Sequence, residues 1–96
     1  MPFTNTSSYP FTRKYIMRNA PYASGVYGLF NTGWVYIGES EDIQRRLLEH
    51  LVTVDPCINC HAPTSFTHEL AAEEVRIGRQ NQLIVEFWSA CRQKLG

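Results

Sequence analysis

The chain has 96 residues, of which 44% are hydrophobic and 19% charged, and its formal net charge is zero. A chain of this length forms one domain, because two separate cores would each bury too little apolar surface. The hydrophobic fraction excludes an intrinsically disordered chain, and the zero net charge excludes a protein that attracts polyanions through its overall charge. Any contact with nucleic acid must therefore come from a local group of Arg and Lys side chains.

Targeting signals and cysteine usage bear on the compartment. Residues 1–22 contain no uninterrupted apolar run of signal-peptide length, and no later stretch could span a bilayer. We therefore expect a cytoplasmic protein with no membrane partner. Three cysteines, an odd number, then favour reduced thiols over a disulfide framework, so that packing alone supplies the stability.

The N-terminal segment differs from the rest of the chain. Residues 1–24 are rich in Ser, Thr, Pro and aromatic residues without a clear period, which predicts an arm rather than regular structure. We expect this arm to pack, through Phe11, Tyr15 and Ile16, on a domain formed by residues 25–96.

Two runs of β-branched and aromatic residues follow. Residues 25–30 (GVYGLF) and 34–38 (WVYIG) predict a pair of antiparallel strands. The three residues between them, Asn31-Thr32-Gly33, predict a hairpin turn in which Gly33 supplies a positive φ. Tyr27 and Tyr36 then fall on adjacent strands, where the pairing register decides whether the two phenols meet.

A helix is predicted over residues 41–52, with Ser40 as its N-cap. On a helical wheel the buried stripe comprises Ile43, Leu47 and Leu51. Arg46 and His50 lie at the edge of this stripe, so their side chains are directed toward the sheet.

The second half of the chain predicts a loop, a third strand and a long helix. Residues 55–63 contain Pro, Asn and two Cys, which is typical of a loop. In residues 64–70 apolar and polar residues alternate, which is typical of a strand. A helix over residues 71–93 would bury Leu83, Ile84, Phe87, Ala90 and Cys91. Arg76 and Gln80 fall within that apolar stripe, either as a hydrogen-bonded structural pair or, for Arg76, as a substrate contact. The element order predicts an α+β fold with about three antiparallel strands flanked by helices.

Several short motifs together resemble a known family. Gly25-Val26-Tyr27, Val35-Tyr36-Ile37-Gly38, Asp42-Ile43, Arg46 and His50 resemble the signature of the GIY-YIG nuclease superfamily. The resemblance covers residues 25–50 and resumes weakly in the last helix. It implies a small antiparallel sheet flanked by helices, in agreement with the order of elements predicted from periodicity, and it implies cleavage of DNA phosphodiesters.

The resemblance also implies roles for individual residues. Tyr27 and Tyr36 would lie beside the scissile phosphate, with the first phenol orienting or deprotonating the attacking water. Arg46 would neutralise the phosphate oxygens as charge develops, and His50 would orient a phenol or pass a proton. Three further candidates for substrate contact are Gly38, Arg76 and Arg79.

The sequence departs from the family pattern at the metal. In the family a Glu on the last helix holds one divalent ion, usually magnesium, and the matching position here is Gln80. An amide offers a carbonyl oxygen but no charge, whereas hard divalent ions depend on carboxylates. Among Glu73, Glu74 and Glu86, only Glu86 lies at the edge of the inner stripe as a substitute ligand. A second family position, an Asn, is Arg92 here.

Other interpretations remain open for the same residues. Tyr27 and Tyr36 could be core aromatics, and Arg46 with His50 could form a solvated helix face. The run Cys57-Ile58-Asn59-Cys60-His61 has the spacing of haem attachment and could form a zinc site with Cys91 or His68, although a structural loop is favoured over both.

Three functions follow from these alternatives. The first is a magnesium-dependent DNA endonuclease that Gln80 impairs or inactivates, whether the amide is natural or introduced. The second is a non-catalytic nucleic-acid-binding domain that reuses the phosphate cleft, and the third is a zinc-organised interaction module. Because so small a chain has little surface for reading bases, specificity would come from a second copy or a partner protein.

Overall fold

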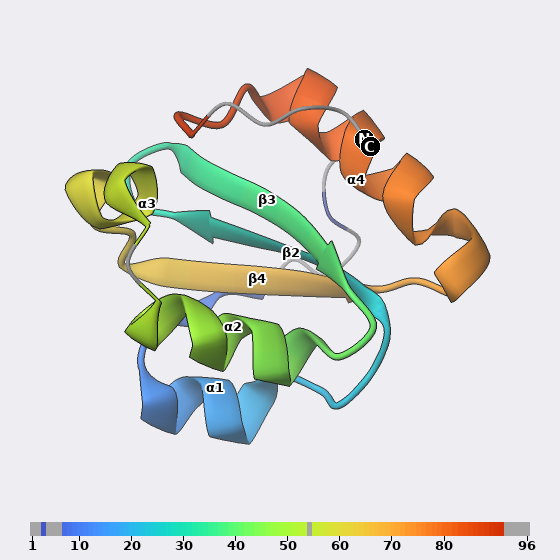
Figure 1. The fold of residues 1–96 in the computed structure, drawn as a ribbon, viewed down its shortest axis with the longest axis horizontal. Coiled ribbons are helices and arrows are strands. Elements are labelled where there is room, and N and C mark those ends of the chain that lie inside the picture. The colour runs from blue at the N-terminus through green and yellow to red at the C-terminus, as the bar shows by residue number, and fades with distance from the viewer. Residues whose placement is uncertain (1–2, 4–6, 54, 92–96) are drawn as a thin grey trace.

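The computed structural model describes residue 3 and residues 7–53 and 55–91. Its elements in chain order are β1 (Tyr9–Pro10), α1 (Arg13–Asn19), β2 (Gly25–Phe30), β3 (Trp34–Ser40), α2 (Ile43–Val52), α3 (Pro56–His61), β4 (Ser65–Leu70) and α4 (Glu73–Phe87). The strands form one antiparallel sheet in the order β1-β4-β2-β3, so the fold is α+β with one short strand more than predicted (Figure 1). The prediction of a loop over residues 55–63 is wrong, because Asp55 caps the short helix α3 and Pro56 suits its first turn. No helix within the described residues has the length and apolarity needed to cross a bilayer.

Successive residues of β2 face opposite sides of the sheet and divide the core in two. Tyr27 and Leu29 join a cluster with residues of α1, α2 and α3, whereas Val26 joins a smaller cluster with Leu83 of α4. The sheet is therefore covered on both faces. Figure 1 shows that β3 lies at the edge of the sheet with α2 to one side and α4 to the other, and the residues at the end of this strand are buried or half-buried.

The hairpin between β2 and β3 forms as predicted, but the predicted role of Gly33 is wrong. No glycine among the described residues has a positive φ. The turn is held instead by Asn31, whose backbone N–H donates to the Gly33 carbonyl and whose side-chain oxygen accepts from the Gly33 N–H. An Asx-type turn of this kind needs no left-handed residue.

The N-terminal segment contains regular structure that its sequence did not predict. β1 pairs with β4 through Tyr9 and Phe66, and α1 begins at the N-cap Thr12. Ile16 is fully buried in the larger core cluster, as expected, and Phe11 packs partly against it, whereas Tyr15 is exposed. The division of the chain at residue 24 stays a prediction.

Helix α2 begins two residues later than predicted. Its N-cap is Asp42, whose side chain accepts from the Arg45 N–H, while the Ser40 hydroxyl accepts from the Asp42 N–H and stabilises the preceding turn. Ile43 and Leu47 are fully buried, but the prediction for Leu51 is wrong, since it is 38% exposed.

The last helix ends six residues earlier than predicted. It stops at Phe87, and Trp88 has a positive φ of 51°. The chain then turns back, so that the N–H groups of Ala90 and Cys91 donate to the carbonyls of Trp34 and Val35 on β3. Ala90 is exposed rather than buried, although Cys91 is buried as expected. The remainder of the predicted helix, including Arg92, lies outside the described residues.

The prediction of three reduced thiols is wrong. Cys57 and Cys91 form a disulfide that joins α3 to the segment after α4, and Cys60 remains a free, exposed thiol. Because Cys57 is bonded to Cys91, neither can serve the zinc site that the Cys57-Cys60-His61 spacing suggested. No group of three or more potential metal ligands occurs in the described part of the chain.

Candidate active site at the end of β3

Three aromatic side chains converge from three elements. Tyr27 on β2, Tyr36 on β3 and His50 on α2 have ring centroids 6.2 Å, 5.5 Å and 5.1 Å apart for the Tyr27–Tyr36, Tyr27–His50 and Tyr36–His50 pairs. The register explains part of this arrangement, because Tyr27 pairs with Gly38 and so lies diagonally from Tyr36. The structure thus brings together three of the residues predicted to form the site.

The Tyr27 hydroxyl and His50 Nε2 are hydrogen-bonded at 2.7 Å. Burial, and then the neighbouring Tyr36, raise the pKa of Tyr27 well above its ordinary value, although Arg46 opposes this. Burial, and then the Arg46 charge, lower the pKa of His50 to about 4. At neutral pH the site therefore contains a protonated phenol beside a neutral imidazole, whose Nε2 accepts the phenol proton when Nδ1 carries the ring hydrogen.

Gly38 makes room for this phenol. A Cβ at position 38 would collide with the hydroxyl and ring atoms of Tyr27, so the Tyr27 side chain lies directly over the backbone of β3. The glycine allows close approach rather than a special backbone angle, since it has no positive φ. Its contribution to the site is therefore steric.

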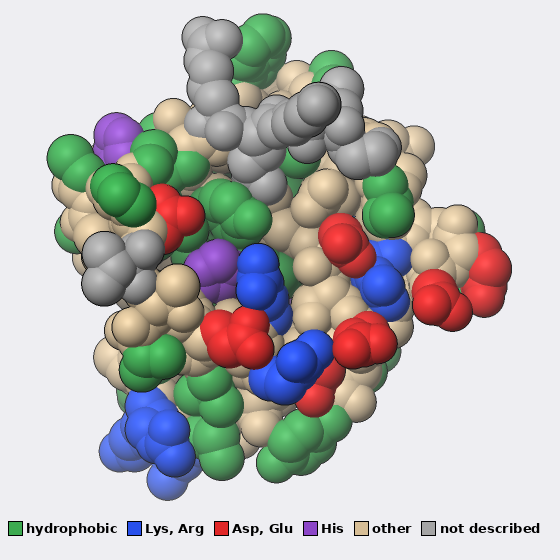
Figure 2. All heavy atoms as spheres, in the orientation of Figure 1, with side chains coloured by type: hydrophobic (Ala, Val, Ile, Leu, Met, Phe, Trp, Pro, Cys, Tyr) green, Lys and Arg blue, Asp and Glu red, His purple; other side chains and the backbone are tan. Residues whose placement is uncertain are grey.

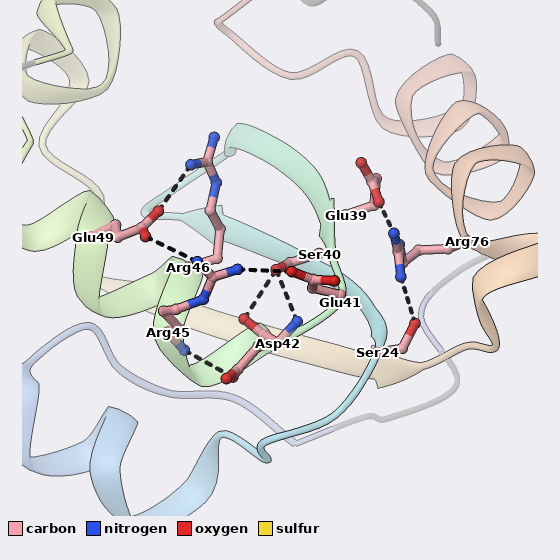
Figure 3. Close-up of polar contacts among 9 residues, drawn as sticks. All are labelled: Ser24, Glu39, Ser40, Glu41, Asp42, Arg45, Arg46, Glu49 and Arg76. Carbon is pink, nitrogen blue, oxygen red and sulfur yellow. Dashed lines mark hydrogen bonds and ion pairs between the residues drawn. The ribbon is translucent and has the colours of Figure 1, made fainter.

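Arg46 lies at the mouth of the cluster. Its side chain is 46% exposed, and Nη1 donates to Glu49 Oε1 at 2.9 Å. This hydrogen bond, together with the nearby Tyr27 and Tyr36, raises the pKa of the Arg46 guanidinium, which stays charged. Glu49 also approaches Arg45, which pairs in addition with Glu41 just before the helix, so both arginines of α2 have carboxylate partners (Figure 3).

The two arginines of α4 predicted as substrate contacts are both engaged with carboxylates of the sheet. Arg76 donates through Nε to Glu39 at 2.5 Å and through Nη1 to the Ser24 hydroxyl at 2.9 Å (Figure 3). Arg79 binds Glu69 through two hydrogen bonds of 2.5 Å and 2.9 Å. Both pairs are largely buried, and they fix α4 against the sheet. For Arg76 the structural alternative is thus supported, with Glu39 rather than Gln80 as its partner.

Gln80 is half-buried and lies one helical turn after Arg76, so both side chains are on the sheet-facing side of α4. Its side chain makes no hydrogen bond within the described residues. The suggested substitute, Glu86, is exposed and borders a shallow hollow with Gly78 and Val85 on another side of the helix. The role of Glu86 as a ligand stays a prediction that its position does not favour.

These donors do not form a carboxylate site for a divalent ion. Gln80 carries no charge, and the sheet carboxylates nearest α4, Glu39 and Glu69, each neutralise a guanidinium. A hard cation needs carboxylate oxygens that are available for coordination. The residues present therefore fit a metal-dependent site poorly.

The face that carries the cluster has no net excess of basic side chains. Figure 2 shows acidic and basic side chains intermingled over α2 and along the end of β3. The sequence indicated the arginines, but it did not indicate that each would be paired. Only the helical pairs of α2, three or four residues apart, were recognisable in advance, whereas the pairs of α4 join residues from distant parts of the chain.

Comparisons with known proteins point to one fold. No family model matches the chain, and no curated protein matches it significantly. Among solved structures, the GIY-YIG N-terminal endonuclease domain of UvrC from Thermotoga maritima, bound to its catalytic divalent cation, magnesium, matches with a TM-score of 0.71 and 20% identity. That match covers 84% of this chain and 94% of the other.

Point mutants of the same domain match similarly. A tyrosine-to-phenylalanine mutant gives a TM-score of 0.72 at 20% identity over 84% of this chain and 94% of that one. Another gives 0.69 at 19% identity over 82% and 96%. Likeness at these identities establishes the fold, while the chemistry has to be argued from the residues of this chain.

Proposed function

We propose that this chain, whose fold is that of the GIY-YIG endonuclease domain, binds a nucleic-acid phosphodiester at the cluster of Tyr27, Tyr36, Arg46 and His50. We propose further that it hydrolyses the bound ester weakly or not at all, because Gln80 replaces the expected carboxylate. The observation that carries the proposal is the convergence of two phenols, a neutral imidazole and a charged guanidinium from three different elements.

Each side chain has a part in this proposal. Arg46 binds the phosphate oxygens through its planar set of donors, exchanging Glu49 for the phosphate. Tyr27 accepts a proton from the attacking water while its own proton passes to Nε2 of His50, to which the phenol is already hydrogen-bonded. Gly38 keeps the Tyr27 hydroxyl in place for this transfer.

A divalent ion bound beside this cluster would supply charge stabilisation for the phosphate. The similar UvrC domain is described with such a catalytic ion, but here the position offers the Gln80 amide and carboxylates that already pair with arginines. We therefore propose weak binding of magnesium or another divalent ion by the natural chain.

The deciding experiment is to restore the carboxylate. With magnesium present, Gln80→Glu is expected to nick supercoiled plasmid DNA at least about 100-fold faster than the natural chain, the loss typical of one removed electrostatic group. Gln82→Glu adds the same charge two residues away and should leave nicking unchanged. Adding Arg46→Ala to Gln80→Glu should abolish the gain. If Gln80→Glu neither nicks DNA nor gains affinity for magnesium, the metal-site assignment fails.

A second candidate function, supported by Gln80 itself, is a non-catalytic nucleic-acid-binding domain. This second function is supported if the natural chain binds DNA in a salt-sensitive manner while Gln80→Glu does not cleave DNA. Whether recognition involves a second copy or a partner protein stays a prediction. Nucleic-acid binding that survives Arg46→Ala unchanged would contradict both functions at this cluster.

A further inference from the structure

The basic residues of α1 are separated from the acidic residues of the chain. The first 38 residues contain no Asp or Glu, and their only basic residues are Arg13, Lys14 and Arg18. All three are on α1 and all are exposed. Within the described residues, none of the three forms an ion pair. In Figure 2 basic side chains gather over α1, apart from the mixed charges over α2 and β3.

The arginines of helices α2 and α4 all form ion pairs with carboxylates. Arg45 and Arg46 both pair with Glu49 of their own helix, and Arg76 and Arg79 pair with carboxylates of the sheet. A guanidinium that already has a carboxylate partner gains less from a phosphate than one that faces water. In this electrically neutral chain, the uncompensated positive charge of the described residues is therefore concentrated on α1.

The surface of α1 is continuous with the candidate site. A hollow beside α1 is lined by Arg13 and Tyr22 and by residues of α2 and its N-cap, among them Asp42, Arg45 and Glu49. Glu49 is also the partner of Arg46. Tyr22 is 77% exposed and shares this hollow with Arg13 and Arg45, and an exposed aromatic ring beside basic side chains offers a surface on which a base can stack.

From this arrangement we infer that α1 is a docking surface for the sugar–phosphate backbone of the nucleic acid whose phosphodiester lies at Arg46. The inference rests on the proposed function, because it assigns the path of the same ligand away from the cluster. A membrane surface is a poorer partner, since Ile16 is fully buried in the core and the exposed large apolar side chains of α1 are limited to Tyr15 and Met17, too few for the continuous apolar face that enters a bilayer.

The test removes two charges from the outer ridge of the helix. Lys14 and Arg18 are one turn apart, and Lys14→Gln with Arg18→Gln removes both without touching the cluster. Binding of a short fluorescein-labelled oligonucleotide, single-stranded or duplex, is measured by anisotropy across a series of salt concentrations. Loss of two phosphate contacts should lower the slope of log K against log salt by about 1.4 for a single strand or about 1.8 for a duplex.

A matched control separates local from overall charge. Thr32→Asp with Asn59→Asp lowers the net charge by the same amount at exposed positions in the β2–β3 turn and on α3. This variant should retain the natural slope, and thermal unfolding of both variants should show that they remain folded. Equal loss of slope in the two double variants would overturn the inference, because only net charge would matter.

The outcomes distinguish this inference from the proposed function. If Arg46→Ala weakens binding but the α1 variant keeps the full slope, the docking surface is wrong while the phosphate cluster stands. If the natural chain binds neither oligonucleotide at low salt, both fail. Binding to vesicles of phosphatidylcholine and phosphatidylserine that depends on Lys14 and Arg18, without binding to oligonucleotides, would overturn the inference in favour of a membrane.

Discussion

The Tyr27 hydroxyl on β2 lies 2.7 Å from Nε2 of His50 on α2. The two residues are 23 positions apart in the sequence, and each is perturbed by burial in the same direction, toward its uncharged form. Transfer of a proton within this neutral pair alone would create a buried phenolate and a buried imidazolium, so Tyr27 has to take up a proton from the attacking water as it releases its own. The pair also makes the stability of the domain depend on pH.

His50 should lower the stability of the fold in mild acid. The pKa of His50 is about 4 in the folded chain and about 6.5 in the unfolded chain. At a pH between these two values, His50 is protonated in the unfolded state and neutral in the folded state. The free energy of unfolding should therefore fall as pH decreases from about 6.5 to about 4, by at most about 3 kcal/mol. His68, whose pKa is also lowered by burial, acts in the same direction.

The measurement compares urea unfolding of the natural chain and His50→Gln at several pH values. As the pH decreases from about 6.5 to about 4, the natural chain should lose more unfolding free energy than His50→Gln, so the difference between the two proteins should become smaller. An imidazole resonance of His50 that titrates near its ordinary pKa would contradict the expectation.

Replacing Gly38 by Ala should disturb both stability and the site. The added methyl group would overlap the Tyr27 hydroxyl and ring, and overpacking of this kind typically costs about 1–3 kcal/mol. Gly33→Ala is the matched control, because nothing lies within 4 Å of a Cβ there and its φ is not positive. That control should leave the unfolding free energy unchanged or raise it by up to about 1 kcal/mol. Equal thermal stability of the two variants would show that Tyr27 can move aside.

Local patterns account for the parts of this fold that the sequence predicted. The strands β2, β3 and β4 lie within two residues of their predicted limits because each is a short run of β-forming residues between turn residues. Strand pairing left open whether Tyr27 and Tyr36 meet, and their convergence with His50 was implied by the resemblance to the family signature. The predicted strands and helical stripes, by contrast, span few residues or repeat with a fixed period.

The features that were missed depend on tertiary contacts. Helix α1 has seven residues and buries only Ile16, too little for a helical period to show. The chain leaves the helical path at Trp88 because the next residues pair with β3, and the disulfide joins cysteines 34 positions apart. The spacing of the cysteines could not indicate which thiols meet.

The disulfide should contribute substantially to stability. In the loop-entropy model, a bridge across 34 positions lowers the conformational entropy of the unfolded chain and so raises the free energy of unfolding by about 3–4 kcal/mol. Reduction with dithiothreitol should therefore lower the unfolding free energy by about this amount, and Cys91→Ser should show the same loss with no further response to the reductant. Cys60→Ser, which removes the free thiol, should keep the full response. A natural chain whose unfolding does not respond to reductant would contradict the role of the bridge.

The ion pair of Glu69 with Arg79 should matter more than the pair of Glu41 with Arg45. The side chains of the first pair are 8% and 13% exposed, whereas those of the second are 75% and 55% exposed. Removing one partner of a buried pair leaves an uncompensated charge, so Glu69→Gln should cost about 3 kcal/mol, and Glu41→Gln at most about 1 kcal/mol. Chemical denaturation of the two variants measures the difference directly. Similar losses would mean that α4 is not fixed to the sheet by this pair.

Glu49 should restrain the affinity of the candidate site for nucleic acid. Its carboxylate holds the Arg46 guanidinium at 2.9 Å, so a phosphate has to displace it before it can use the donors of Arg46. Glu49→Gln removes this competing charge and should lower the Kd for a short oligonucleotide at low salt by about 3- to 10-fold, as expected for one partly exposed charge. Glu41→Gln, which removes an equal charge from the partner of Arg45, should change the Kd less. Combining Glu49→Gln with Arg46→Ala should cancel the gain. If both single variants improve binding equally, the improvement comes from the change in net charge and the ion pair of Glu49 with Arg46 does not limit phosphate binding.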